Sequence, residues 1–189
     1  YRVRPSLIGP VSFLALSKRA DDAPEGFSPL DRLPELLGVY EELLASLAAA
    51  GADWVQLDES ALAVDHAGID DAALAALAGN ALGRLSSAAG APQLFVATAY
   101  GRLEAGLTAL LDSGVGAVSV DLVKGAGQLD ALTEAPAPRL VAGVVDGHNV
   151  WRSDLDAPLA DRKIPRLNSR HLGTSSPLLC WKAQLYWCR

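Results

Sequence analysis

Short apolar runs alternate along this chain with longer segments in which apolar residues recur at helical spacing. Five runs fit buried β-strands: residues 6–10, 54–59, 94–100, 117–122 and 140–146. Each run is short, apolar and bounded by polar or turn-forming residues. Buried strands that alternate with helices indicate a parallel sheet, because parallel neighbours need a crossover and the crossover is usually a helix. The pattern therefore predicts an α/β fold with about five parallel strands and intervening helices.

Four segments that follow these runs are predicted to be helices. They span residues 30–50, 69–89, 103–111 and 124–133. In the first, the apolar residues from Leu33 to Leu47 follow i, i+3, i+4, i+7 spacing, with glutamates on the opposite side. Pro10 should end or bend the first strand, because proline cannot donate to a strand ladder. The polar segment 18–29 is expected to be an exposed loop.

Composition narrows the possible settings of the chain. With 189 residues and 50% apolar residues, it can form one domain with a core. Its net charge of −6 argues against a nucleic-acid-binding surface, and no apolar stretch reaches the roughly 18 residues of a membrane span. Cys180 and Cys188 do not form a disulfide framework, so a cytoplasmic setting is expected. The chain contains no methionine, and we expect a fragment whose true start lies upstream.

The composition changes near residue 159. Residues 159–189 contain six basic residues and one acidic residue, whereas the preceding part is acidic. The alanine-rich helical pattern stops there, and no continuous periodicity replaces it. We therefore divide the chain into a β/α domain over residues 1–158 and an atypical basic tail over residues 159–189. The tail is expected to be irregular and unrelated to the domain, through a frame change or an unrelated junction; a basic docking tail is the alternative.

Acidic residues stand where three of the predicted strands end. Asp58 and Glu59 end the second run, Asp121 lies at the end of the fourth, and Asp146 ends the fifth. The carboxyl ends of parallel strands meet at one edge of a sheet, and ligands in such folds bind there. The sequence therefore predicts that these acids position a ligand.

Asp58, Glu59 and Asp121 also have a structural interpretation. Adjacent residues of a strand point to opposite faces, so only one of Asp58 and Glu59 can face into the fold, and such an acid can cap the next loop. Asp121 interrupts an apolar strand, and a lone buried charge is costly. Asp121 must therefore lie at the strand end, form an ion pair or be functional. Lys124 is the nearest candidate partner for such a pair.

The fifth run continues into a polar group that includes His148 and Asn149 beside Asp146. His148 could act as an acid or base near neutral pH. The alternative is a tight turn in which Asp146 and Asn149 bind backbone amides. We include His148 and Asn149 among the candidates for positioning a ligand.

No metal site is predicted in this chain. His171, Cys180 and Cys188 are spaced in a way that matches no zinc pattern. The sequence Gly125-Ala126-Gly127 could begin a phosphate-binding helix, but it lacks both the third glycine of a dinucleotide fingerprint and the lysine spacing of a P-loop.

Three ordered motifs resemble the cobalamin-independent methionine synthases. They are residues 7–14 (LIGPVSFL), 54–62 (WVQLDESAL) and 143–152 (GVVDGHNVWR), and the similarity extends through residues 121–123. It covers roughly residues 3–156 and corresponds to the later part of the family's N-terminal barrel. The resemblance implies a partial (β/α)8 TIM barrel. Ser60 stands where the family usually has proline, and His148 where arginine is common.

The resemblance also implies a reaction. The family transfers a methyl group from 5-methyltetrahydropteroyl-polyglutamate to homocysteine sulfur, which gives methionine. A zinc ion binds the thiol and keeps it as the nucleophilic thiolate. The family's zinc ligands lie in a C-terminal barrel outside this chain. That C-terminal barrel is the partner that the resemblance implies. We therefore expect no zinc and no activity in this chain alone, and no nucleic-acid or membrane partner.

Two further functions stay open at this point. The chain could be a non-catalytic scaffold half that pairs with another chain, or a barrel enzyme of the uroporphyrinogen decarboxylase type that uses the strand-end carboxylates. Five strands cannot close an eight-stranded barrel. Either alternative therefore needs further strands or an oligomer.

Overall fold

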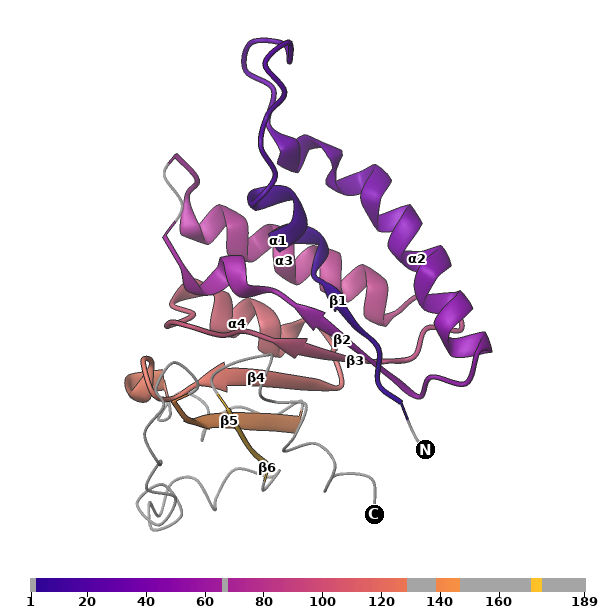
Figure 1. Cartoon of the computed structure of the whole chain (residues 1–189), viewed down its shortest axis with the longest axis vertical. Coiled ribbons are helices and arrows are strands. Elements are labelled where there is room, and N and C mark those ends of the chain that lie inside the picture. The colour runs from indigo at the N-terminus through magenta and orange to yellow at the C-terminus, as the bar shows by residue number, and fades with distance from the viewer. Residues whose placement is uncertain (1–2, 66–67, 129–138, 147–170, 175–189) are drawn as a thin grey trace.

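The computed structural model describes residues 3–65, 68–128, 139–146 and 171–174. These residues form one six-stranded sheet whose strands follow in sequence order, and all neighbouring strands are parallel. The strands are β1 (Ser6–Ile8), β2 (Trp54–Asp58), β3 (Gln93–Ala97), β4 (Ala117–Asp121), β5 (Arg139–Val145) and β6 (His171–Thr174). The predicted α/β class and the five predicted parallel strands are confirmed (Figure 1).

The helices of the described residues lie between the strands. They are α1 (Pro10–Ala15), α2 (Leu33–Ala49), α3 (Asp71–Ser86) and α4 (Ala105–Asp112), with three 3-10 helices, η1 (Pro29–Arg32), η2 (Ser60–Ala63) and η3 (Ala126–Gln128). Three of the four predicted helices are confirmed as α2, α3 and α4. Of the fourth, the described residues contain only η3, because residues 129–138 lie outside the described part.

One face of the sheet packs against the helices. Alternate strand residues, such as Val55 and Leu57 of β2, join the main core with Leu44 of α2 and Leu82 of α3. The helices lie together on this side of the sheet (Figure 1). On the opposite face, a smaller buried cluster of Phe95, Ala97, Ala117 and Val141 packs against Trp54. This is the side-chain alternation expected of a β/α barrel wall, with one face toward the helices and one toward the barrel interior.

Helix α1 was not predicted. The sequence pattern ends the first strand at Pro10, but Pro10 instead occupies the first turn of a six-residue helix with Gly9 as its N-cap. Proline is well suited to that position, because its missing N–H would have no partner in the helix and its φ is already helical. The segment 18–29 forms turns that are mostly exposed, as expected.

Strand β6 was also not predicted, since the tail after residue 158 was expected to be irregular. Residues 171–174 pair in parallel with β5, although with a register irregularity between Gly143 and Val145. Four residues with a glycine among them are too short for an apolar run to stand out. The division of the chain at residue 158 stays a prediction, because residues 147–170 and 175–189 lie outside the described part.

Within the described residues, no helix combines the length and the apolar character that crossing a membrane would require.

Candidate functional site

The carboxyl edge of the sheet brings three of the predicted acids to one side of the molecule. Asp58 is the last residue of β2, Asp121 is the last residue of β4, and Asp146 directly follows β5. Because all the strands are parallel, these positions share one edge, as the sequence predicted. His148 and Asn149 lie outside the described residues. The ligand-positioning role of all six candidates stays a prediction.

Asp58 ends a line of polar contacts across the inner face of the sheet. Its carboxylate accepts hydrogen bonds from Ser6 Oγ (3.1 Å) and Gln56 Nε2 (2.6 Å). Gln56 Oε1 accepts in turn from Arg4 Nη2 (2.7 Å), and the Arg4 guanidinium lies 4.4 Å from the centroid of the Phe95 ring. An ionised carboxylate offers about four acceptor positions. Asp58 is therefore oriented by its neighbours and keeps acceptor capacity for a ligand.

Glu59 has a different environment from Asp58. Its side chain is fully buried, and its two oxygens accept from the backbone N–H groups of Val11 (3.1 Å) and Ser12 (2.7 Å) in the first turn of α1. Ser12 Oγ accepts in return from the backbone N–H of Ala61 (3.0 Å), at the start of η2. These reciprocal contacts join the segments that follow β1 and β2. Glu59 thus makes the contacts of a helix cap.

Burial raises the pKa of Glu59 to about 7. The hydrogen bonds from Ser12 and Val11 favour the charged form, but they offset only part of the desolvation cost, and the nearby charge of Asp58 raises the pKa further. Burial also raises the pKa of Tyr40 to about 12, with a smaller contribution from the charge of Glu59. The Tyr40 hydroxyl donates to the backbone oxygen of Ile8 (2.7 Å), so α2 is fixed to the end of β1.

Asp121 is buried and organises the loops after two strands. Its carboxylate accepts from the backbone N–H groups of Val123 (2.8 Å) and Lys124 (3.0 Å) after β4, and of Tyr100 (3.2 Å) after β3. The sequence named Lys124 as its nearest partner; the contact is with the backbone amide of that residue. Three amide donors explain why a carboxylate is tolerated at the end of an apolar strand.

Gln128 is a residue of this edge that sequence reasoning missed. Its side chain is buried in η3; Oε1 accepts from the backbone N–H of Leu103 (2.8 Å), and Nε2 donates to the backbone oxygens of Gly125 (3.2 Å) and Asp121 (3.4 Å). Gln128 and Asp121 therefore connect the same two loops. A single glutamine after a glycine pair carries no signal in the sequence, because its partners are backbone groups distant along the chain.

Among the residues that the structure describes, no three His, Cys, Asp or Glu side chains are grouped so as to hold a metal ion. The strand-end acids are spread over β2, β4 and β5. The carboxylates of Glu59 and Asp121 are occupied by backbone amides. The described residues therefore position loops, and they do not fit a zinc site.

The family follows from comparison with known proteins. The model of the cobalamin-independent synthase N-terminal domain matches residues 1–168. This chain belongs to that family. A relative from Rhodococcus jostii is 46% identical over 158 residues, and one from Mycobacterium bovis is 48% identical over 157 residues. Both are named 5-methyltetrahydropteroyltriglutamate–homocysteine methyltransferase, and the matches cover 83% and 82% of this chain.

The matched region is a small part of those relatives. It covers 20% of the length of each, so the chain spans about a fifth of the proteins that it resembles. The fold is also found in a B12-independent methionine synthase from Shewanella sp. W3-18-1, solved in complex with selenomethionine, with a TM-score of 0.70 at 17% identity. That similarity covers 93% of this chain and 55% of the solved chain, which supports a partial barrel.

Proposed function

We propose that this chain is part of a methyltransferase that moves a methyl group from 5-methyltetrahydropteroyl-polyglutamate to homocysteine and so makes methionine. The proposal rests on the family match over residues 1–168, and the reaction is inferred from the names of the relatives. The same names favour this reaction over a decarboxylase of the uroporphyrinogen type. We also infer a cytoplasmic location, where the two cysteines would stay reduced.

Within such an enzyme, the described residues act as a wall of the N-terminal barrel. Asp121 and Gln128 fix the loops after β3 and β4, while Glu59 fixes the segments after β1 and β2. Of the three acids Asp58, Glu59 and Asp121, Asp58 is the one that is half-buried and not fully buried, and it is held by Ser6 and Gln56. We infer that this edge holds the barrel mouth in shape and that Asp58 orients a polar group of a ligand.

The reacting centre is proposed to lie elsewhere in the enzyme. Methyl transfer to homocysteine needs a thiolate, and a bound zinc ion supplies it by lowering the pKa of the thiol. The described residues provide no such ligand set. We propose that zinc, homocysteine and a further barrel belong to the full-length enzyme, and we expect the chain by itself to be inactive.

A chimera tests this proposal. The matched segment of this chain replaces the corresponding 158 residues of the Rhodococcus jostii methyltransferase, and methionine formation is measured for the chimera, the parent enzyme and the isolated chain. We expect zinc-dependent activity in the chimera and none in the isolated chain. A well-folded chimera that makes no methionine, or an isolated chain that does, would contradict the proposal.

A further inference from the structure

The buried hydroxyl of Ser119 in β4 has no hydrogen-bond partner in the described part of the chain. Ser119 is only 7% exposed. Its backbone oxygen accepts from the hydroxyl of Thr98 (2.6 Å), but its own Oγ takes part in no hydrogen bond with the described residues. No fully enclosed side-chain oxygen or nitrogen of these residues lacks a partner, so the Ser119 Oγ borders space that water can reach. A largely buried hydroxyl without a partner indicates a place for a polar ligand.

Ser119 faces the inner side of the sheet. Its neighbours along β4, Val118 and Val120, belong to the core on the helical side. Successive side chains of a strand point to opposite faces, and Ala117, two residues away, belongs to the inner cluster with Phe95. The hydroxyl therefore lies on the face that a barrel turns toward its interior, two residues before the carboxyl end of β4.

The register of the sheet places Asp58 in the same row as Ser119. Asp58 of β2 is paired with Ala97 of β3, and Ala97 is paired with Ser119. The Cα atoms of Asp58 and Ser119 are therefore two strand spacings apart, which is about 10 Å. This separation is too long for a direct hydrogen bond between two short side chains, and the alanine between them adds only a methyl group. A small polar group above Ala97 can contact both side chains.

The charge of Asp58 indicates what this group is. The two donors that hold its carboxylate, Ser6 Oγ and Gln56 Nε2, are neutral, and no ion pair of the described residues includes Asp58. Arg4, in the same line of contacts, donates to Gln56 and lies over the ring of Phe95. A hydrogen bond between two charged groups is stronger than one between neutral groups. The carboxylate therefore favours a positively charged donor.

Apolar side chains flank the row at both ends. Ile8 of β1 is paired with Asp58, and Val141 of β5 is paired with Ser119. Val141 is buried, whereas Ile8 is 43% exposed. A ligand whose charged group lies between Asp58 and Ser119 can place a short alkyl group against Ile8 and so remove apolar surface from water.

We infer that Asp58 and Ser119 bind the ammonium group of a small organic amine, with Asp58 as the counter-ion, the Ser119 Oγ as a second acceptor and Ile8 against the alkyl part. The inference deepens the ligand role of Asp58 in the proposed function and rests on it. It adds a second residue of the site and the chemical class of the ligand.

An NMR titration of the full chain with n-butylammonium tests this inference. Tetramethylammonium, a cation without N–H donors, and butan-1-ol, a neutral alcohol, are the matched probes. We expect saturable binding of n-butylammonium alone, about 10-fold or more weaker in Asp58→Asn and about 3-fold or more weaker in Ser119→Ala, because these variants lose a charged and a neutral acceptor. Asp112→Asn is the control, since it changes an exposed carboxylate at the end of α4 and should bind like the wild type.

Several outcomes would overturn the inference. The first is the absence of saturable binding, which would leave water as the partner of Ser119. The second is binding that is unchanged in Asp58→Asn or in Ser119→Ala. The third is binding by the isolated chain that the Rhodococcus jostii chimera lacks, because a side chain of the remaining barrel would then fill the row. If the isolated chain does not fold, the same probes and variants are compared in the chimera.

The proposed function is tested separately from this site. A chimera that makes methionine but binds n-butylammonium equally well with and without Asp58→Asn would contradict the inference and leave the function standing. Binding that depends on Asp58 and Ser119 in a folded chimera that makes no methionine would support the amine site and contradict the function.

Discussion

At the scale of single residues, the carboxyl edge depends on Glu59 and Asp121, whose partners are backbone amides, and on Asp58, which is bound by the side chains of Ser6 and Gln56. The sequence could identify Asp58, Glu59 and Asp121, because each interrupts or ends an apolar strand. It could not assign their roles, because the donors come from segments distant along the chain: Glu59 binds the start of α1 and Asp121 binds the loop after β3. The ion pair of Glu41 and Arg84 could not be predicted from the sequence either, because the two residues are 43 positions apart.

Glu59 should make stability depend on pH. Its pKa in the folded chain is about 7, above the ordinary value of 4.5, so the folded state holds a proton that the unfolded state releases. The resulting stabilisation is full below about pH 4.5 and is lost as the pH rises to about 7, a change of about 3 kcal/mol. In Glu59→Gln this contribution is absent. Urea unfolding between pH 5 and 8 should show the free energy of unfolding of the wild type falling relative to the variant.

The control for that experiment is Glu25→Gln, which changes an exposed glutamate in the loop 18–29. It should follow the pH dependence of the wild type. Parallel curves for the wild type and Glu59→Gln would show that the buried carboxyl group does not titrate in this range.

Gly9 should be intolerant of any side chain. A Cβ at this position would overlap the Glu59 side chain, which α1 holds in place. Gly9→Ala should therefore lower the free energy of unfolding by roughly 1–3 kcal/mol, a typical cost of overpacking.

Gly38→Ala is the matched control for that substitution. Gly38 lies inside α2, and an added Cβ meets nothing within 4 Å. Alanine should stabilise the chain there by up to about 1 kcal/mol, because it is the better helix former. Thermal unfolding of both variants measures the contrast, and equal effects would contradict the packing described around Glu59.

At the scale of elements, periodicity predicted the parts of the fold that are long and regular. The helices α2, α3 and α4 and the strands β1 to β5 were predicted, since each has a clear apolar period or run. Helix α1 was missed because it begins at a proline and is held by a capping acid from another strand. β6 was missed because four residues that include a glycine show no period, and their strand geometry depends on pairing with β5.

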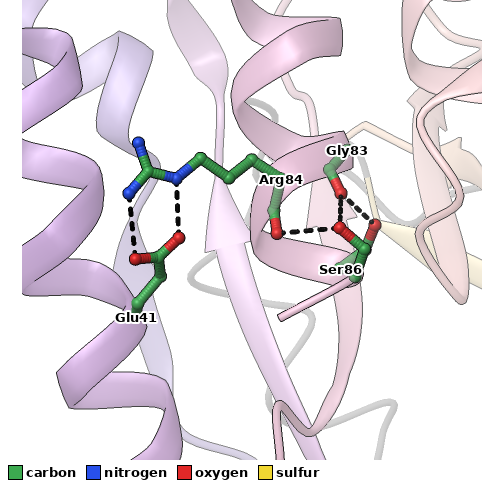
Figure 2. A network of polar contacts seen from close by, with 5 residues as sticks. Glu41, Gly83, Arg84 and Ser86 are labelled. Atoms are coloured by element: carbon green, nitrogen blue, oxygen red, sulfur yellow. Dashed lines mark hydrogen bonds and ion pairs between the residues drawn. The ribbon is translucent and has the colours of Figure 1, made fainter. Parts of the chain in front are cut away.

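The contact between α2 and α3 gives a prediction at this scale. The hydrogen bonds from Arg84 hold the pKa of the Glu41 carboxyl below its usual range. This pair should stabilise the packing of α2 on α3 above the ordinary pKa of a glutamate, and the contribution should be lost as the pH falls through the lowered value. Carboxyl NMR titration should show the pKa of Glu41 returning to its ordinary range in Arg84→Met. An unchanged pKa would show that the ion pair in Figure 2 is not formed in solution.

At the scale of the whole molecule, the described residues form a parallel sheet with helices on one face and with Asp58, Asp121 and Asp146 at its carboxyl edge. The common direction of the strands could be predicted, because β/α alternation favours parallel neighbours. Their order in the sheet followed only from the resemblance to a barrel family. The exposure of Val39 and Leu43 on α2 could not be predicted, because a helical pattern alone does not show which of its apolar residues face the core. The helical cover on one face and the shared carboxyl edge fit the barrel wall that we propose.

The most direct test of this account is methionine formation by the Rhodococcus jostii enzyme after its matched segment is replaced by this chain. The account predicts that the chimera converts homocysteine to methionine in a zinc-dependent reaction and that the isolated chain does not. A folded chimera without activity, or turnover by the isolated chain, would contradict the claim that this chain is a structural wall of a methyltransferase.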